Sequence, residues 1–185
     1  MIANIQAVGM IEFNSIAAGI EASDFMIKAS LVEPLMMKTI CPGKFVSAVF
    51  SDVAAVQASI AAGLKACPDT IVDHFVIPNI HPDVISAMAA AMEPGDGPAL
   101  GVIETFSAAS SIVAADAAVK AANINLIEVR IAMGLGGKAF CTFNGDVSSV
   151  KAAAEAGAAQ VEATGLLVRK VVIPSISPEV MQRIM

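Results

Sequence analysis

The sequence predicts an α+β protein made of two tandem copies of one β-α-β-β-α-β unit. Two observations lead to this prediction. A long segment recurs in the same order about 90 residues later, which is enough chain for a domain. Within each copy, short apolar runs alternate with alanine-rich segments. An aspartate, which favours the N-cap of a helix, precedes the second alanine-rich segment. We therefore expect two ferredoxin-like units, each followed by a short terminal helix.

The repeat extends through nearly the whole chain. The segment "AVGMIEFNSIAAGIEASDFMIKAS", which begins at Ala7, aligns with "ALGVIETFSAASSIVAADAAVKAA", which begins at Ala99. Further on, "PGKF" aligns with "GGKAF", and "VIPNIHPDV" aligns with "VIPSISPEV". The stretch "MEPGDGPA" between the copies is rich in Pro and Gly, as linkers are. We expect a first domain at 1–92 and a second at 99–185.

Each element of one copy has a counterpart in the other. A strand precedes a helix with small and apolar residues, and two strands then form a hairpin around a glycine turn. Asp52 and Asp146 are expected to cap the second helix, and the fourth strand ends at "VIP". A Pro in its first turn begins the terminal helix of each copy. The first four elements are expected at 7–13, 15–30, 35–40 and 45–50 in one copy, and at 99–105, 107–122, 126–132 and 139–143 in the other.

The composition excludes several classes of protein. Of the 185 residues, 56% are hydrophobic and 15% charged, with a net charge of −6. The longest run without Asp, Glu, Lys or Arg is 53–64, shorter than the about 20 residues that span a membrane. The start, "MIANIQAVGMIEF", has no basic segment typical of a secretory signal. Net acidity, with no Trp or Tyr, argues against a nucleic-acid partner. The hydrophobic excess is therefore best explained by burial in an assembly in the cytoplasm.

The stretch "KTICPGKF" places Cys41 on a Pro-Gly turn between two apolar runs. No residue nearby could complete a local metal site or catalytic pair with it. From the residues alone, a packed turn cysteine and a metal ligand both remain open. Cys141, in an apolar strand, and Cys67, after a helix, are expected to be structural. We expect no disulfide and no catalytic site.

Several of these features recur together in both halves. They are "G-x-I-E" at the first strand, a lysine four residues after an aspartate, a glycine turn before "K-F" or "K-A-F", and a terminal "VIP". In this respect the chain resembles bacterial microcompartment shell proteins with two tandem domains. The resemblance implies a homotrimer that looks like a hexamer and tiles, with other shell proteins, into the microcompartment shell. It also implies that the turns 39–44 and 133–138 line a central pore, with Thr39, Ile40, Pro42 and Gly43 from one and Leu135, Gly136 and Gly137 from the other.

The motif "KTICPGKF" is similar to that of the iron–sulfur trimeric shell proteins of propanediol-utilisation compartments. This resemblance implies one [4Fe–4S] cluster per trimer, with Cys41 of each subunit as a ligand. Three thiolates are one fewer than usual, so one iron would take a non-protein ligand. The implied function is electron transfer across the shell, with a luminal redox enzyme as a partner. Two alternatives stay open: a trimer with a plain metabolite-conducting pore, and a soluble two-domain regulator that binds a small molecule.

A few further side chains receive roles. Lys28 and Lys120 match the lysine at the shell edge that the family uses between adjoining tiles. The arginine that the family often carries after the terminal "IP" is replaced by Asn79 and by Ser175. Structural roles are expected for two glutamates and two histidines: hydrogen bonds of Glu12 and Glu104, a strand position for His74, and a loop or helix-cap position for His81.

Overall fold

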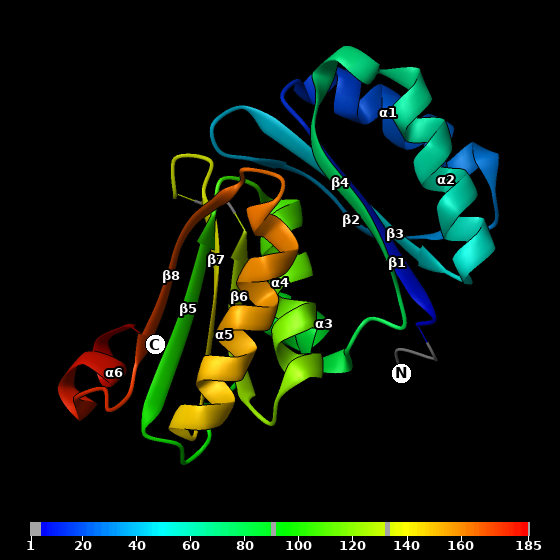
Figure 1. Ribbon diagram of the computed structural model, residues 1–185. Coiled ribbons are helices and arrows are strands. Elements are labelled where there is room, and N and C mark those ends of the chain that lie inside the picture. The colour runs from blue at the N-terminus through cyan, green and yellow to red at the C-terminus, as the bar shows by residue number, and fades with distance from the viewer. Residues whose placement is uncertain (1–4, 90–91, 132–133, 185) are drawn as a thin grey trace. The chain divides into compact units, whose positions relative to one another are not determined.

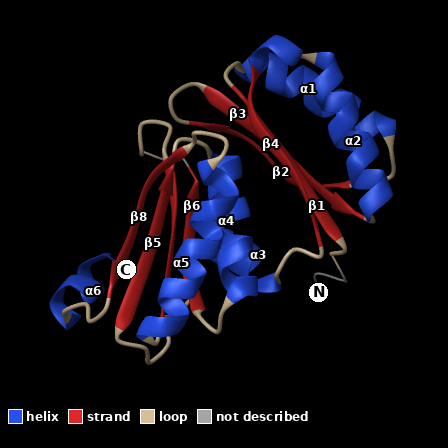
Figure 2. Ribbon diagram, in the orientation of Figure 1, coloured by secondary structure: helices blue, strands red, loops and turns tan. Residues whose placement is uncertain are grey.

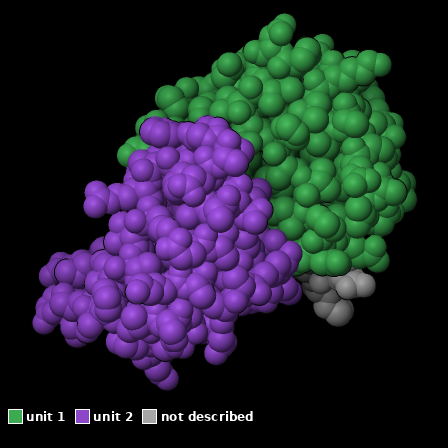
Figure 3. All heavy atoms as spheres, in the orientation of Figure 1, with its two compact units in different colours: residues 1–80, 107–110, 132–138 green, residues 81–106, 111–131, 139–185 purple. Residues whose placement is uncertain are grey.

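The computed structural model describes residues 5–89, 92–131 and 134–184 and forms two compact units (Figure 1). The first unit comprises 1–80 with the short segments 107–110 and 132–138. The second comprises 81–106, 111–131 and 139–185 (Figure 3). The expected domains 1–92 and 99–185 follow the sequence repeat, whereas these units follow contacts in space. They differ because each unit includes short segments of the other repeat.

The first unit has the expected β-α-β-β-α-β order. Its sheet is antiparallel, in the order β2-β3-β1-β4, and α1 and α2 pack against each other over one face of it (Figure 2). A short 3-10 turn, Pro68–Thr70, precedes β4 and was not expected from the sequence. The elements are β1 (Ala7–Phe13), α1 (Ile16–Ala29), β2 (Glu33–Ile40), β3 (Lys44–Ser51), α2 (Val53–Ala66) and β4 (Ile71–Pro78).

The second unit repeats this order, and its sheet runs β6-β7-β5-β8. Helix α5 packs on β5 and β8, and α3, the terminal helix of the first repeat, packs against β6. Helix α4 begins in the segment 107–110, which belongs to the first unit. The elements are α3 (Pro82–Met88), β5 (Ala99–Thr105), α4 (Ala108–Ala121), β6 (Asn125–Ile131), β7 (Ala139–Gly145), α5 (Val147–Glu162), β8 (Leu167–Ile173) and α6 (Pro178–Ile184).

The helices begin where the capping residues predict. Asp52 caps α2 and Asp146 caps α5, and each carboxylate accepts a backbone hydrogen bond three residues on, at 2.9 Å. The hydroxyls of Ser148 and Ser149 also donate to Asp146 and hold the pKa of its carboxyl well below its usual value. Strand bounds differ from the expected ones by one or two residues, and the expected strand end at 132 lies outside the described residues.

The central strand β1 is buried along its whole length. Its side chains join those of α1, α2 and β3 in a core that includes Ile11, Phe13, Met26 and Ile60. Because both faces of β1 are buried, its residues are apolar or small except for Glu12, whose carboxylate must find partners inside the protein. Within the part of the chain that the structure describes, no helix combines the length and apolarity needed to cross a membrane.

Two helix glycines mark close approaches in these cores. A Cβ added to Gly157 of α5 would lie 2.6 Å from the backbone oxygen of Ala114 in α4. A Cβ added to Gly63 of α2 would instead meet the ends of the Ile11 and Met26 side chains, which can move aside. A side chain is therefore excluded more strictly at Gly157 than at Gly63.

We expect Gly157→Ala to lower the free energy of unfolding by about 1–3 kcal/mol, because the helix backbones must separate. In an unobstructed helix the same change is favourable, by up to about 1 kcal/mol. Gly63→Ala is the matched control and should cost less. Denaturant unfolding at fixed protein concentration measures both, and an equal or larger loss for Gly63→Ala would contradict this account of the packing.

Candidate functional site

The turn that carries Cys41 closes the hairpin of β2 and β3. Ile40 and Lys44 are paired across the hairpin, and Cys41, Pro42 and Gly43 form the exposed turn between them. The Cys41–Pro42 peptide bond is cis. Gly43 has φ +77°, in the left-handed region that glycine adopts without a steric penalty. The sequence thus fixes a tight turn that presents the Cys41 thiol to the outside of the chain.

The second predicted pore turn lies beside the first, within the first compact unit. Its described part begins at Gly134, while Met133 lies outside the described residues. A Cβ added to Gly137 would be 2.8 Å from Pro42 Cδ, which places the two turns in contact. Among the other predicted pore residues, Thr39 and Gly136 are exposed, Leu135 is half-buried and Ile40 is buried. The structure brings the two turns together, and the pore itself stays a prediction.

The three thiols have different surroundings. Cys41 is exposed and borders a shallow, mostly apolar pocket that Ile16 and Thr39 also line. Burial, and next the nearby Glu21 carboxylate, raise the pKa of Cys67. Burial raises the pKa of Cys141 to about 12. Since the thiolate is the form that binds metals, Cys41 is the thiol best placed to act as a ligand.

The described part of one chain does not bring together enough ligands for a metal centre. Among the residues that the structure describes, no group of three or more His, Cys, Asp or Glu side chains is close enough to hold a metal ion. Cys41 therefore fits an iron–sulfur cluster only as one of several identical ligands from different copies. The Cys41 turn is compatible with that arrangement. The thiol is exposed, and the space around Gly43 on the same turn is open.

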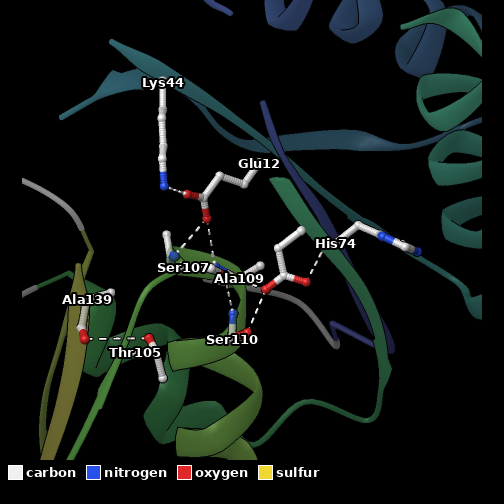
Figure 4. Close-up of polar contacts among 10 residues, drawn as sticks. Glu12, Lys44, His74, Thr105, Ser107, Ala109, Ser110 and Ala139 are labelled. Carbon is white, nitrogen blue, oxygen red and sulfur yellow. Dashed lines mark hydrogen bonds and ion pairs between the residues drawn. The ribbon is translucent and has the colours of Figure 1, made fainter. Parts of the chain in front are cut away.

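A buried carboxylate lies behind the Cys41 turn. Glu12 of β1 is fully buried, and its Oε1 accepts a hydrogen bond from Lys44 Nζ at 2.7 Å (Figure 4). Its Oε2 accepts from the backbone N–H groups of Ala108, at 2.7 Å, and Ala109, at 3.4 Å. These are the first residues of α4, whose N–H groups point out of the helix end and carry its positive dipole. Glu12 therefore joins the end of the Cys41 turn to the start of α4, both in the first compact unit.

A second carboxylate reinforces the start of α4. Asp73 of β4 accepts hydrogen bonds from the hydroxyls of Ser107 and Ser110, the latter at 2.6 Å. Ser107 Oγ in turn accepts from the Ser110 N–H at 2.9 Å, as a helix N-cap does. The structural role expected for Glu12 is thus confirmed. The partners were missed, because nothing local in the sequence links Glu12 to a helix start 96 positions later, or Asp73 to serines 34 and 37 positions later.

The two predicted edge lysines lie in the last turns of α1 and α4. Each forms an ion pair of 2.6 Å with an aspartate one turn earlier, Lys28 with Asp24 and Lys120 with Asp116. The Lys28 pair is exposed, whereas the Asp116 side chain is only 9% exposed and also accepts a hydrogen bond from the His81 N–H. An edge position stays a prediction for both lysines. His81 does cap a helix, α3, as expected, and His74 lies exposed in β4.

Comparison with known proteins agrees with this fold and its duplication. The BMC domain model matches residues 7–80 and again 99–176. The bacterial microcompartment shell protein PduT of Citrobacter freundii is 45% identical over 91% of this chain and 92% of its own length. The shell protein EutM of Salmonella typhimurium is 46% identical over 41% of this chain and 77% of its own. A crystal structure of a microcompartment protein from Desulfitobacterium hafniense superposes with a TM-score of 0.83 at 47% identity, covering 97% of this chain and 99% of the other.

The fold and the paired turns define a duplicated α+β protein whose two halves are built alike. The chain belongs to the BMC-domain family of bacterial microcompartment shell proteins, with two domains in tandem. The sequence-based fold class and family are therefore confirmed. The family is structural rather than catalytic, and a soluble small-molecule regulator is no longer a competing interpretation.

We expect Glu12→Ala to lower the free energy of unfolding by about 3–5 kcal/mol, because it leaves the Lys44 ammonium and the α4 amides without their buried partner. Lys28→Ala is the control and removes an exposed ion pair worth at most about 1 kcal/mol. Denaturant titration at matched protein concentration compares them. Equal small losses would mean that Glu12 does not hold this part of the fold together.

Proposed function

We propose that this shell protein forms a homotrimer in which Cys41 of all three copies binds one [4Fe–4S] cluster at a central pore, for electron transfer across the shell. The observation that carries the proposal is the exposed Cys41 thiol on the hairpin turn, next to the matching turn of the second repeat. The similarity to PduT of Citrobacter freundii over both domains supports placing these turns at a shell pore.

Unequal exposure of equivalent helices supports assembly into a homotrimer. In α3, Val84 and Ala87 are buried, and the helix packs against β6. In α6, its counterpart in the second repeat, Val180 is 49% exposed and Ile184 is 47% exposed. An apolar helix face that is covered in one repeat and open in the other would be covered by another copy of the chain. Two domains per chain and three chains give six equivalent positions, which close a ring.

The environment of the thiols supports Cys41 as the cluster ligand. Iron–sulfur clusters are held by thiolates, and a cluster would supply one-electron transfer at this position. Three copies of Cys41 would provide three of the usual four ligands, so one iron would take a ligand from outside the protein. The raised pKa values of Cys67 and Cys141 disfavour their thiolates. The ion pair of Lys44 with buried Glu12 would hold the base of the turn in place.

The proposal also covers partners. Other shell proteins would adjoin the trimer in a facet, with Lys28 and Lys120 at the edges between tiles. A luminal redox enzyme would exchange electrons with the cluster. The alternative in this family is a trimer with a plain metabolite-conducting pore that Cys41 only narrows, and the first experiment below separates the two.

The first experiment removes all three ligands with one substitution per chain. After anaerobic reconstitution, we expect wild-type protein to hold one cluster per trimer, and Cys41→Ser to hold none, because a hydroxyl does not ionise at neutral pH as a thiol can. Iron and sulfide content and the electron paramagnetic resonance signal are the measurements. Cys67→Ser and Cys141→Ala are the controls and should retain the cluster. Full iron and sulfide in Cys41→Ser, or none in the wild type, would leave the plain pore as the function.

The second experiment tests the edge role of Lys28. We expect Lys28→Asp to keep the trimer but to abolish extended sheets in electron micrographs, because the edge would lose its lysine and would carry two neighbouring carboxylates there, one of them Asp24. Lys65→Asp, an equal charge change in the exposed last turn of α2, is the control and should leave the sheets intact. Lys120 is less suitable, because its ammonium neutralises the nearly buried Asp116. Intact sheets in Lys28→Asp would exclude the edge role.

A further inference from the structure

The internal repeat contains two sets of the residues that form the contact between Glu12 and the start of α4. In the repeat, Glu12 corresponds to Glu104, and the helix residues Ala108 and Ala109 correspond to Ile16 and Ala17 of α1. Within one chain the structure shows the first version, with the Glu12 carboxylate on the amides of α4. The second version would place Glu104 on the amides of α1.

The residues of this second version are open to the outside of the chain. The whole first turn of α4, from Ser107 to Ser110, is buried. In contrast, Ile16 is 38% exposed and Ala17 is also exposed at the start of α1. Glu104 is half-buried, whereas Glu12 is fully buried. Each side of the second contact is therefore accessible to another copy.

We propose that the Glu104 carboxylate of one copy accepts hydrogen bonds from the backbone N–H groups of Ile16 and Ala17 in the neighbouring copy. This inference rests on the homotrimer proposed above. Each copy offers one glutamate and one helix start, so the contact runs head to tail, and three such contacts close a ring. Glu12 shows that one carboxylate can accept from a lysine and from a helix end together. Other partners of Glu104 within its own chain are thus compatible with the contact.

The helix start of α1 is built to receive a carboxylate in the same way as that of α4. Ser15 Oγ accepts from the Ala18 N–H at 3.4 Å, as Ser107 does from Ser110. The first N–H groups of a helix have no partner within the helix, and a carboxylate placed there is favoured by the helix dipole. The exposed Ile16 side chain and that of Ile20, which is 57% exposed, add apolar surface next to the same helix start.

The proposed contact of Glu104 between copies would lack one feature that accompanies the Glu12 contact within the chain. Asp73, which binds the hydroxyls of Ser107 and Ser110, has Arg169 as its counterpart. Ser110 itself corresponds to Ala18, which has no hydroxyl. The aspartate–serine contacts therefore have no equivalent between copies. Of the polar contacts seen around Glu12 and Asp73, only the carboxylate–amide contact has the residues to recur between copies, through Glu104. Its loss should therefore weaken assembly clearly.

Ile16→Pro tests the contact by deleting one N–H group and little else of the helix. Proline is well tolerated at the first position of a helix, which Ile16 occupies after the Ser15 cap. Ser15 has φ −131° and ψ 127°, an extended conformation that suits a residue before proline. Ile16→Ala is the matched control, because it removes the same side chain but keeps the N–H. All variants carry Cys41→Ser, so that no bound iron contributes to assembly.

We expect Ile16→Pro to dissociate at a protein concentration at least about 10-fold higher than Ile16→Ala, since hydrogen bonds to charged groups contribute about 1.5–3 kcal/mol. Sedimentation analysis over a dilution series measures this, and circular dichroism verifies the fold of each variant. Glu104→Gln should weaken assembly in the same direction. Combined with Ile16→Pro, it should add less than its separate effect, because both changes remove one contact.

The outcomes distinguish this inference from the trimer on which it rests. A wild-type protein that stays monomeric would overturn both. A stable wild-type trimer with equal dissociation of Ile16→Pro and Ile16→Ala would overturn only the Glu104 contact. Fully additive effects of Glu104→Gln and Ile16→Pro would do the same, because the two residues would then act independently.

Discussion

A carboxylate without access to water must be matched by donors on all sides, and Glu12 imposes this requirement on the first compact unit. Its two oxygens are satisfied by a lysine side chain and by the backbone of a helix start, which are far apart in the sequence. The ion pair also fixes the residue that ends the Cys41 turn. The position of the exposed thiol therefore depends on a charge that is completely hidden from solvent.

The fold could be predicted closely from local signals. The N-cap aspartates Asp52 and Asp146 and the proline-initiated terminal helices gave element positions within one or two residues, because capping and φ restriction act over a few neighbouring residues. The repeat then doubled each signal. The site was predicted less fully. The exposed thiol turn was recognised, but the hydrogen bonds of Asp73 to Ser107 and Ser110 were not, since long-range polar contacts leave no periodic pattern.

The two repeats share a fold but differ in what they expose. The first carries an accessible thiol in its hairpin turn, whereas the second has glycines with positive φ at three positions of the matching turn. The first also has an exposed helix start in α1, whereas the start of α4 is buried. A ring of such chains would alternate two kinds of turn around its centre. A ligand residue carried by only one kind of turn would then occur three times around the ring rather than six. Three ligands suit a metal centre, which binds only a few.

The packing of α3 on the sheet of the second unit has a further consequence for how the gene can change. The helix is encoded before the Pro- and Gly-rich linker, but its buried residues Val84 and Ala87 belong with β6, encoded after it. Cutting the gene at the linker would give two halves that each lack part of their own packing. Each half of the chain thus supplies contacts to the other, and a single-domain version of this protein would need equivalent contacts from another copy.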